Sequence, residues 1–555
     1  MNIIGIFNAH NAGVCLFQDG KLIFAVSEER LNRQKFSIGF PIKSLKLCLD
    51  YAKLKPKDIN CISYGGYSSP ALESIQDYFK TIKEEDAPIG AERLFNSLSV
   101  DNKFISDFFY NCGKFLPNIP IRTYDHHLCH ALPALYQSSF SRSYILTADG
   151  RGDLQSMVLW FASSKLSINR VKTFCELKSL GFFYGQITRF LGFTPHRHEG
   201  KVTGLAAYGK KTHLLKIFRE LISFDKGDIK VSSRYMPFNR PNNNIYLENF
   251  LIKYSKEDIA WAAQNLLEEI IINLINFYVP KNSNLCLSGG VFSNVKLNQR
   301  IRENCSLSNY FIYPEMGDGG ISVGSAIAAA IDLQSGITLS TDMFLGPSFK
   351  WDSTIKKFKN NYNILQYKSR DQYIKKIVQL LIGNKVIGLF SGRMEFGPRS
   401  LGARSIIIAT TSKSINDEVN KRLNRTEFMP FAPCTLQERA SDMYIDLKKQ
   451  DVNTKFMTTC YQCTDLMREI SPAVVHVDNS ARPQILDDNF PNKLLLDVLK
   501  AYYINTGIPN LINTSFNNHE EPIVCTPMDA LKSLDNNNVD YIITDCLKII
   551  NLRRT

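Results

Sequence analysis

The chain opens on residues 2–27, NIIGIFNAHNAGVCLFQDGKLIFAVS, and this stretch carries the signals that decide its fold. Residues 3–7 form an apolar run that enters a polar turn, His10-Asn11-Ala12-Gly13. Residues 14–17 are apolar again, and Gln18-Asp19-Gly20 marks a second turn before residues 21–27. Short apolar runs separated by Gly-containing turns are typical of antiparallel strands joined as hairpins. The sequence therefore predicts three antiparallel strands at its start.

The same order of signals recurs further along the chain. Residues 144–149 form an apolar run that ends in Asp149-Gly150, and residues 155–162 form a returning strand. Two more apolar runs, 285–287 and 310–313, lead into Gly-rich turns at 288–290 and 317–320. Backbone N–H groups can approach an anion closely where side chains are absent. Two such sheets, with Gly-rich turns facing a cleft, predict the duplicated α/β fold of actin, sugar kinases and heat-shock ATPases.

A composition shift at residues 335–352 separates this part of the chain from a second α/β unit. In the second unit, residues 374–382 have a helical pattern and residues 386–390 have the pattern of a buried strand. We therefore expect two domains, at residues 1–345 and 352–555.

Charge and composition narrow the class of protein. The net charge is +13, but Lys and Arg form no long basic block, so we expect no nucleic-acid partner. No apolar run reaches the ~18 residues that a membrane span needs, and the N-terminus lacks a basic leader region. The 13 cysteines are scattered, and we interpret the single CxxC, Cys460 and Cys463, as structural. These features favour a cytoplasmic protein with no membrane partner.

The segment Asp125-His126-His127-Leu128-Cys129-His130 indicates a metal site. His126 and His130 are four residues apart, so on a helix their imidazoles share one face. Asp149 and Asp318 each follow an apolar run and precede a glycine. Two imidazoles and two carboxylates suit a divalent metal ion. The alternative is that the histidines are surface or capping residues and that the aspartates bond to their own turns.

Other residues of the first domain are candidates for contacts with substrates. His10 lies in the first turn, where this fold faces nucleotide phosphates, and is either a general base for a hydroxyl or a locally bonded residue. The Gly-rich segments 199–209 and 288–294 suit the approach of a phosphate, although such turns are common. His127 would point away from the His126–His130 face, either toward a substrate or into the structure. The candidates for nucleotide or substrate binding are His127, Lys201, Gly204, Gly289, Gly290 and Asn294.

In the second domain, arginines alternate with glycines and serines over residues 391–405, SGRMEFGPRSLGARS. Guanidinium groups bind phosphate oxygens through paired hydrogen bonds, so we expect this segment to hold an oligophosphate or an acyl phosphate. Scattered surface arginines are the alternative, which the apolar and glycine neighbours disfavour. The candidate anion-binding residues are Arg393, Arg399, Arg404, Ser405, Arg425, Arg482, Asn513, Ser515 and Asn517.

These motifs together resemble the O-carbamoyltransferase family, which includes the nodulation-factor, cephem, novobiocin and aminoglycoside carbamoyltransferases. The matching pieces are residues 125–131, 199–209, 392–405 and 513–517, and the resemblance runs nearly end to end. It implies an actin-like N-terminal domain similar to the tRNA threonylcarbamoyl transferases, followed by a YrdC-like C-terminal α/β domain.

The resemblance also implies a reaction in two steps. In the C-terminal domain, ATP (with Mg²⁺) and carbamoyl phosphate would form carbamoyl-adenylate and pyrophosphate. In the N-terminal domain, His10 would deprotonate the hydroxyl of a small-molecule acceptor, a natural product or a sugar. The carbamoyl group would then pass to that hydroxyl, releasing AMP. An iron(II) ion, or another divalent metal, is expected at His126, His130, Asp149 and Asp318.

Two other functions stay open at this point. One is a tRNA threonylcarbamoyl-type transferase, which the fused C-terminal domain and the lack of a basic tract disfavour. The other is an actin-fold ATPase without group transfer, which would leave the arginine-rich segment without a role. The sequence also departs from the family in its first turn, where an acid and serines usually follow the histidine and Asn11-Ala12-Gly13 stand here. The acceptor and the oligomeric state are left open, with a homodimer as one option.

Overall fold

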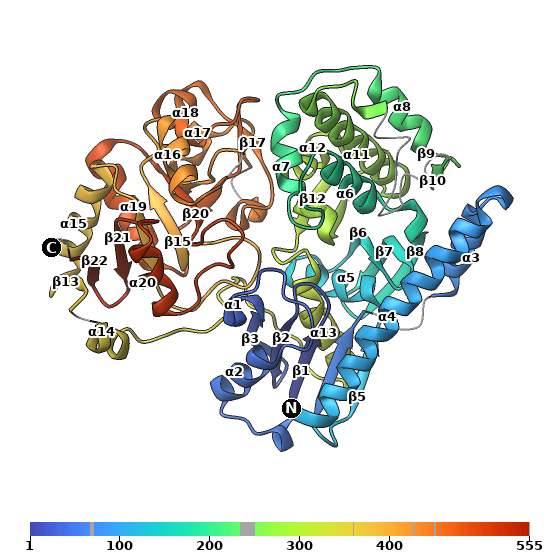
Figure 1. Ribbon diagram of the computed structural model, residues 1–555, viewed down its shortest axis with the longest axis horizontal. Helices are drawn as coiled ribbons and strands as arrows, with labels where there is room; N and C mark the ends of the chain where they lie inside the picture. The colour runs from blue at the N-terminus through green and yellow to red at the C-terminus, as the bar shows by residue number, and fades with distance from the viewer. Residues whose placement is uncertain (67–70, 234–249, 359, 426–427, 449–450, 554–555) are drawn as a thin grey trace. The chain divides into compact units, whose positions relative to one another are not determined.

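The computed structural model describes residues 1–66, 71–233, 250–358, 360–425, 428–448 and 451–553 (Figure 1). It divides into two compact units. Unit 1 consists of Met1–Glu28 and Ser37–Thr341, and unit 2 consists of Glu29–Phe36 and Asp342–Thr555. The boundary between Thr341 and Asp342 lies close to residue 345, where the first domain is expected to end. The sequence prediction placed residues 29–36 in the first domain, whereas the structure places them in unit 2.

Arginine side chains hold the segment Glu29–Phe36, which contains helix α1 (Glu29–Asn32), within unit 2. Arg30 donates from Nη2 to the carbonyl oxygen of Gly397 at 2.9 Å. Arg33 donates from Nη2 to the carbonyl oxygen of Pro522 at 2.6 Å and from Nη1 to that of Ile523 at 2.7 Å. These partners are backbone atoms far along the chain, so no local sequence pattern could predict the contacts.

Unit 1 contains two five-stranded sheets with the same topology. The first has the order β3-β2-β1-β4-β5 and the second the order β12-β11-β6-β7-β8. In each sheet three antiparallel strands are joined on one side by two parallel strands. The first sheet consists of β1 (Asn2–Phe7), β2 (Gly13–Gln18), β3 (Lys21–Ser27), β4 (Cys61–Gly65) and β5 (Ile121–Tyr124). The second consists of β6 (Ser143–Gly152), β7 (Gln155–Ser164), β8 (Ser167–Cys175), β11 (Ser283–Ser288) and β12 (Leu307–Ile312). The repeat confirms the duplicated fold that the sequence predicts.

Helices α5 (His126–Gln137) and α13 (Ile321–Asp332) lie in direct backbone contact within unit 1. A Cβ atom at Gly324 would lie only 1.8 Å from the carbonyl oxygen of Cys129, so the two helices touch where the side chain is absent. Asp318 stands just before α13, and the paired histidines lie on α5. The contact therefore fixes the separation between these acidic and imidazole side chains.

The remaining helices and the small hairpin of unit 1 complete the described part of the unit. They are α2 (Ile42–Ala52), α3 (Leu72–Thr81), α4 (Ala87–Phe115), α6 (Leu180–Phe190), α7 (Glu199–Ala206), α8 (Leu214–Leu221), β9 (Ile222–Asp225), β10 (Asp228–Val231), α11 (Lys256–Tyr278) and α12 (Val295–Asn304). Among the described helices of the chain, none has both the length and the apolar character needed to cross a bilayer.

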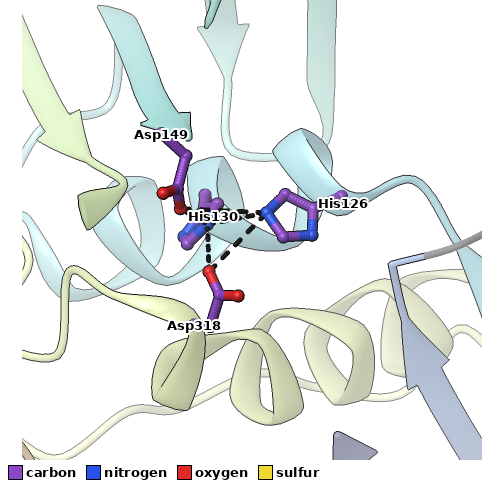
Figure 2. A group of neighbouring side chains, drawn as sticks. All are labelled: His126, His130, Asp149 and Asp318. Atoms are coloured by element: carbon purple, nitrogen blue, oxygen red, sulfur yellow. Dashed lines mark hydrogen bonds and ion pairs between the residues drawn. The ribbon is translucent and has the colours of Figure 1, made fainter. Parts of the chain in front are cut away.

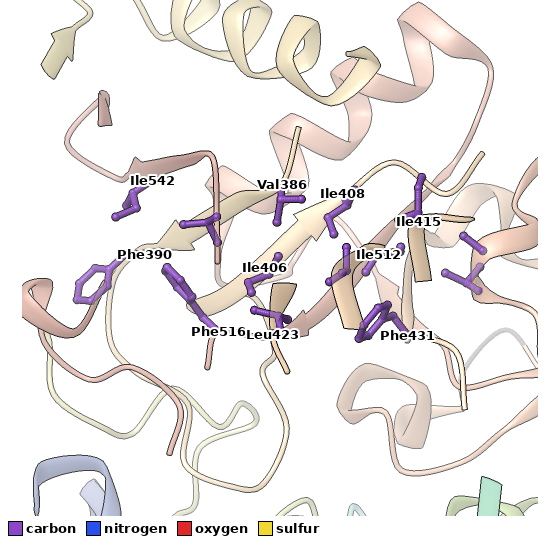
Figure 3. Close-up of a cluster of buried hydrophobic side chains, with 14 of the residues drawn as sticks. Val386, Phe390, Ile406, Ile408, Ile415, Leu423, Phe431, Ile512, Phe516 and Ile542 are labelled. Carbon is purple, nitrogen blue, oxygen red and sulfur yellow. The ribbon is translucent and has the colours of Figure 1, made fainter. Parts of the chain in front are cut away.

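Unit 2 is built on one eight-stranded sheet with the order β13-β22-β21-β14-β15-β20-β16-β19. Both faces of the sheet are buried, because Ile406 and Ile408 on β15 join one hydrophobic cluster and Ile407 joins another (Figure 3 shows the first). A sheet covered on both faces needs unbroken apolar runs in its strands, which explains why residues 386–390 could be recognised. The expected helix and strand correspond to α15 (Arg370–Ile382) and β14 (Ile387–Phe390).

The other elements of unit 2 cover and extend this sheet. Its remaining strands are β13 (Tyr362–Gln366), β15 (Arg404–Ile408), β16 (Pro433–Leu436), β19 (Gln484–Leu486), β20 (Asn510–Ser515), β21 (Tyr541–Thr544) and β22 (Lys548–Leu552), with a separate pair, β17 (Tyr461–Gln462) and β18 (Ser480–Ala481). Its other helices are α14 (Asp352–Phe358), α16 (Ser414–Arg422), α17 (Ala440–Met443), α18 (Asp465–Ile470), α19 (Lys493–Thr506) and α20 (Pro527–Asp535). Cys460 and Cys463 are buried free thiols.

Candidate metal centre

Two histidines at the start of α5 form one wall of the candidate metal centre. Asp125 is the N-cap of α5, and its Oδ1 accepts the N–H of Leu128 at 2.8 Å. This cap starts the helix at His126, so His126 and His130 share a face as their spacing predicts. Their Nε2 atoms are 3.1 Å apart, and both residues are only 1% exposed.

Asp149 and Asp318 bring carboxylates to the same point from two separate elements (Figure 2). Asp149 lies on β6, and its Oδ2 is 3.0 Å from Nε2 of His130. Asp318 opens the turn before α13, and its Oδ1 is 3.4 Å from Nε2 of His130 and 3.7 Å from Nε2 of His126. One ligand atom from each of the four residues lies within 4.8 Å of all the others. The structure thus brings together the four residues proposed from the sequence.

Burial and ion pairing oppose each other in this cluster. Burial disfavours a charged His130, but its bonds to Asp149 and Asp318 outweigh burial and raise its pKa to about 9. Burial also favours a neutral Asp149, yet hydrogen bonds from His126 and His130 hold its pKa well below the usual range. Two acids and two bases therefore satisfy each other when no cation is present. A metal cation that binds these four side chains must displace the protons on the two histidines, so its affinity depends on pH.

Glycines let the surrounding backbone close tightly around the cluster. A Cβ atom at Gly152 would lie 2.1 Å from Cγ of His126. A Cβ atom at Gly290 would lie 3.0 Å from Oδ1 of Asp149, and Gly289 adopts a φ of +100° that favours glycine. The turn at 288–290 therefore packs against Asp149, and the Gly-rich pattern seen in the sequence serves this close approach.

His10 joins the cluster from the first turn of the chain. Its Nε2 atom is 3.2 Å from Oδ2 of Asp318, while Oδ1 of the same carboxylate faces the two buried histidines. The His10 side chain is 45% exposed, whereas that of Asp318 is 5% exposed. Asp318 therefore gives His10 an acidic neighbour, and the side chain of His10 is more exposed than those of the four clustered residues.

The structure adds a residue that the sequence did not single out. The ring centroid of His196 lies 6.1 Å from that of His10, and Phe182 contacts His196 edge-on at 6.4 Å. His196 has a φ of +64°, an uncommon backbone for a residue with a side chain. Its N–H donates to Oε1 of Glu199 at 2.6 Å. The only available signal was its place just before the segment 199–209.

The other candidates of unit 1 lie in well-packed surroundings. His127 is fully buried, and its Nδ1 bonds to Oγ1 of Thr147 at 2.9 Å, so it does not join the four-residue cluster. Burial lowers its pKa to about 3, which keeps the ring neutral. Asn294 caps α12 by accepting the N–H of Leu297. Lys201 is buried on α7 with its ammonium group 5.9 Å from the ring centre of Phe193, and Gly204 lies on the same helix.

In unit 2, Arg425 gathers several of the predicted residues around one guanidinium group. Its Nη2 donates to Oγ of Ser515 at 3.1 Å and to Oδ1 of Asn517 at 3.0 Å, and its Nη1 donates to Oγ1 of Thr514 at 2.9 Å. Lys35 lies in the segment Glu29–Phe36 of unit 2, and burial lowers the pKa of its ammonium group. Glu29 and Glu520 raise this pKa, and the nearby charge of Arg425 lowers it further. Arg425, the polar residues 514–517 and Lys35 therefore bring basic and short polar side chains from three separate segments close together.

Other predicted residues of unit 2 are used inside the fold. Arg404 is fully buried, and its Nη1 donates to the carbonyl oxygens of Ser391, Gly392 and Ala403. Arg393 donates to the carbonyl oxygens of Gly346 and Leu345. Ser405 and Asn513 are buried, and Arg399 and Arg482 are partly buried.

Comparison with known proteins identifies the family. Residues 2–330 match the family model described as carbamoyltransferase N-terminus, and residues 378–550 match the one described as carbamoyltransferase C-terminus. Uncharacterized protein MJ1051 of Methanocaldococcus jannaschii is 32% identical over 98% of each chain. Nodulation protein NolNO of Sinorhizobium fredii is 29% identical over 96% of this chain and 78% of its own, and nodulation protein U of the same species is 24% identical over 94% of each. The chain belongs to the carbamoyltransferase family, and it is an enzyme that transfers carbamoyl groups.

Proposed function

We propose that the protein is an ATP-dependent O-carbamoyltransferase that acts on a hydroxyl of a small natural product or sugar. The observation that carries this proposal is the meeting of His10 with the cluster of His126, His130, Asp149 and Asp318. A reachable base beside a buried set of metal donors is what transfer from an activated phosphate ester to a hydroxyl needs.

The four-residue cluster is the proposed metal site. Two imidazole nitrogens and two carboxylate oxygens form a borderline donor set, which suits iron(II) and other divalent first-row metals. The four donor atoms converge from one helix, one strand and one turn, so the chain holds them in place before any ion arrives. When bound, the ion supplies a positive charge for the leaving phosphate.

His10 is the proposed base of the transfer step. We place the proton of the neutral imidazole on Nε2, which lies 3.2 Å from Oδ2 of Asp318, so that the lone pair of Nδ1 is left for the acceptor hydroxyl. As Nδ1 takes the proton, the acceptor oxygen bonds to the carbonyl carbon of carbamoyl-adenylate. The bond between that carbon and the phosphate oxygen breaks, and AMP leaves. Asp318 holds the imidazole in the correct tautomer and stabilises its charge after the proton has moved.

Unit 2 is the proposed site of adenylate formation. Carbamoyl phosphate, ATP and water would give carbamoyl-adenylate, pyrophosphate and phosphate, with Mg²⁺ accompanying ATP. The guanidinium group of Arg425, which Ser515 and Asn517 hold in place, offers positive charge for these anions. Arg404, by contrast, bonds to the backbone carbonyls of Ser391, Gly392 and Ala403.

The two steps can be tested separately. Wild-type protein is incubated with labelled ATP and carbamoyl phosphate, without an acceptor, and carbamoyl-adenylate and pyrophosphate are measured. We expect both products to require carbamoyl phosphate. ADP and phosphate alone would support the actin-fold ATPase instead, and dependence on added tRNA would support the threonylcarbamoyl-type transferase.

The role of His10 is tested with His10→Ala and with His213→Ala as a control. His213 is an exposed histidine at the start of α8, away from the cluster. We expect His10→Ala to keep adenylate formation and to lower transfer by roughly 10²- to 10⁴-fold. The control should change neither step. Loss of both steps in His10→Ala would show that the residue supports the structure.

A further inference from the structure

Helix α4 carries an exposed stripe that no described element of unit 1 covers. Figure 1 shows α4 as the long blue helix along the edge of unit 1. The α4 stripe consists of Ala91, Phe95, Leu98, Asn102, Ser106, Phe109 and Gly113, all of them exposed. Phe95 is 73% exposed and Phe109 is 47% exposed, and Tyr110, next to Phe109 in the sequence, is 71% exposed. An exposed aromatic patch of this length on a rigid element marks an interaction surface.

The opposite face of α4 is anchored firmly, so the stripe is displayed on a fixed support. Ser97 donates to Oε1 of Glu176 at 2.9 Å, and Asp101 pairs with Arg151 at 3.0 Å. Phe108 stacks on Tyr64 with ring centroids 4.1 Å apart. Little order would have to be imposed on α4 for a partner to bind, and this lowers the entropic cost of association.

The spacing of the α4 stripe is the same in both directions along the helix. Its members follow one another at intervals of 4, 3, 4, 4, 3 and 4 residues, with Asn102 at the centre. A second α4 running antiparallel would therefore place Phe95 against Phe109 and Asn102 against its own copy. A two-fold axis produces such a self-complementary contact. Intervals of 3 and 4 keep all seven positions on one helix face.

From this pattern we propose that two copies of the chain associate through antiparallel packing of their α4 stripes around a two-fold axis at Asn102. The three aromatics alone expose roughly 400 Å² of apolar surface per copy, about half of the ~800 Å² per partner that stable interfaces bury. Ala91 and Gly113 at the ends of the stripe permit close approach of the backbones. The amide of Asn102 can bond its symmetry mate and fix the register.

The charges around the α4 stripe agree with this arrangement. None of its seven residues is charged, as is typical of interface cores. In the antiparallel pair Glu92 of one copy lies across from Lys114 of the other, at both ends of the contact. Two copies of Lys103 flank the axis on the exposed rim, where solvent screens their repulsion.

Sedimentation equilibrium of the full-length protein tests the proposal. We expect a dimer at micromolar concentration, and Phe95→Glu or Phe109→Glu should raise its dissociation constant about 100-fold or more, because each change occurs twice across the axis. Phe79→Glu is the matched control: Phe79 is 61% exposed on α3, outside the stripe, and its change should leave the dimer intact. Thermal denaturation checks that every variant folds.

Cysteine cross-linking tests the direction of the two helices in a Cys546→Ser background, which removes the exposed native thiol. Asn102→Cys should form a disulfide-linked dimer under mild oxidation. Ala91→Cys should not, because the two copies of residue 91 would be about 33 Å apart along the helices. A monomer at all concentrations, a dimer that both glutamate variants leave intact, or equal linking through residues 91 and 102 would overturn the proposal.

Discussion

Adding one methyl group at Gly152 should disrupt the proposed metal centre while sparing the rest of the protein. In Gly152→Ala the new Cβ would lie 2.1 Å from Cγ, 2.2 Å from Cδ2 and 2.6 Å from Nδ1 of His126. Ordinary contacts of a Cβ atom fall at 3.4–4 Å, so the imidazole must move by more than an ångström. His126 is 1% exposed and is packed on all sides, so its ring has no free space to enter.

Two effects of Gly152→Ala can be given a size. Overpacking of a buried site costs about 1–3 kcal/mol of folding free energy. Changes to residues that merely orient a metal ligand cost roughly 10- to 100-fold in metal affinity, and displacing a ligand ring itself should cost at least as much. The proposed metal affinity is measured by competition with a chelator, and stability is measured by thermal denaturation of the metal-free protein.

The control for Gly152→Ala is Gly336→Ala. No atom lies within 4 Å of a Cβ built at Gly336, and its backbone does not require glycine. The control should match wild type in both measurements, and both variants should keep the carbamoyl-adenylate formation that we propose for unit 2. Wild-type metal affinity in Gly152→Ala would refute the assignment of His126 as a ligand.

Three further outcomes are expected. The His130 pKa of about 9 lies above its ordinary value, so the charged imidazole stabilises the folded state fully below pH ~6.5 and this stabilisation is lost as the pH rises through 9. The melting temperature of the metal-free protein should therefore fall progressively from pH 7 to 9. His130→Gln should make the melting temperature less dependent on pH over this range. His130→Ala should lose the proposed divalent metal, measured by elemental analysis of both proteins; unchanged metal content would remove His130 from the site. Arg404→Lys should lower the free energy of unfolding in urea by about 2–4 kcal/mol, because an ammonium group cannot span the carbonyl oxygens of Ser391, Gly392 and Ala403. Arg370 is exposed, so Arg370→Lys should stay within about 0.5 kcal/mol of wild type.

The part of the site that could be predicted is the part that follows local periodicity. The helical spacing of His126 and His130 needs only four residues of sequence, and Asp149 is placed by the end of an apolar strand. The repeated order of strands and Gly-rich turns likewise sufficed for the duplicated fold. Each of these signals depends on residues close together in the sequence, because helix spacing, strand patterns and turns are set by local backbone geometry.

The contacts that were missed join distant segments of the chain. Nothing in the sequence pairs His10 with the far carboxylate oxygen of Asp318, because the two meet only when both sheets are formed. The arginine pattern of residues 391–405 does not tell a guanidinium that faces a ligand from one that bonds backbone carbonyls, as Arg404 does. The two kinds of arginine differ in the burial and the partners of the guanidinium group, and these are known only once the chain is folded.

The return of residues 29–36 into unit 2 limits how the two halves of this enzyme can be recombined. A gene fragment that begins at residue 342 encodes a unit in which the carbonyl groups of Pro522 and Ile523, between β20 and α20, lack the guanidinium of Arg33. A chimaera that exchanges C-terminal halves between relatives must therefore carry these eight residues with it. We therefore expect residues 29–36 to vary together with residues 342–555, although more than 300 positions separate them in the sequence.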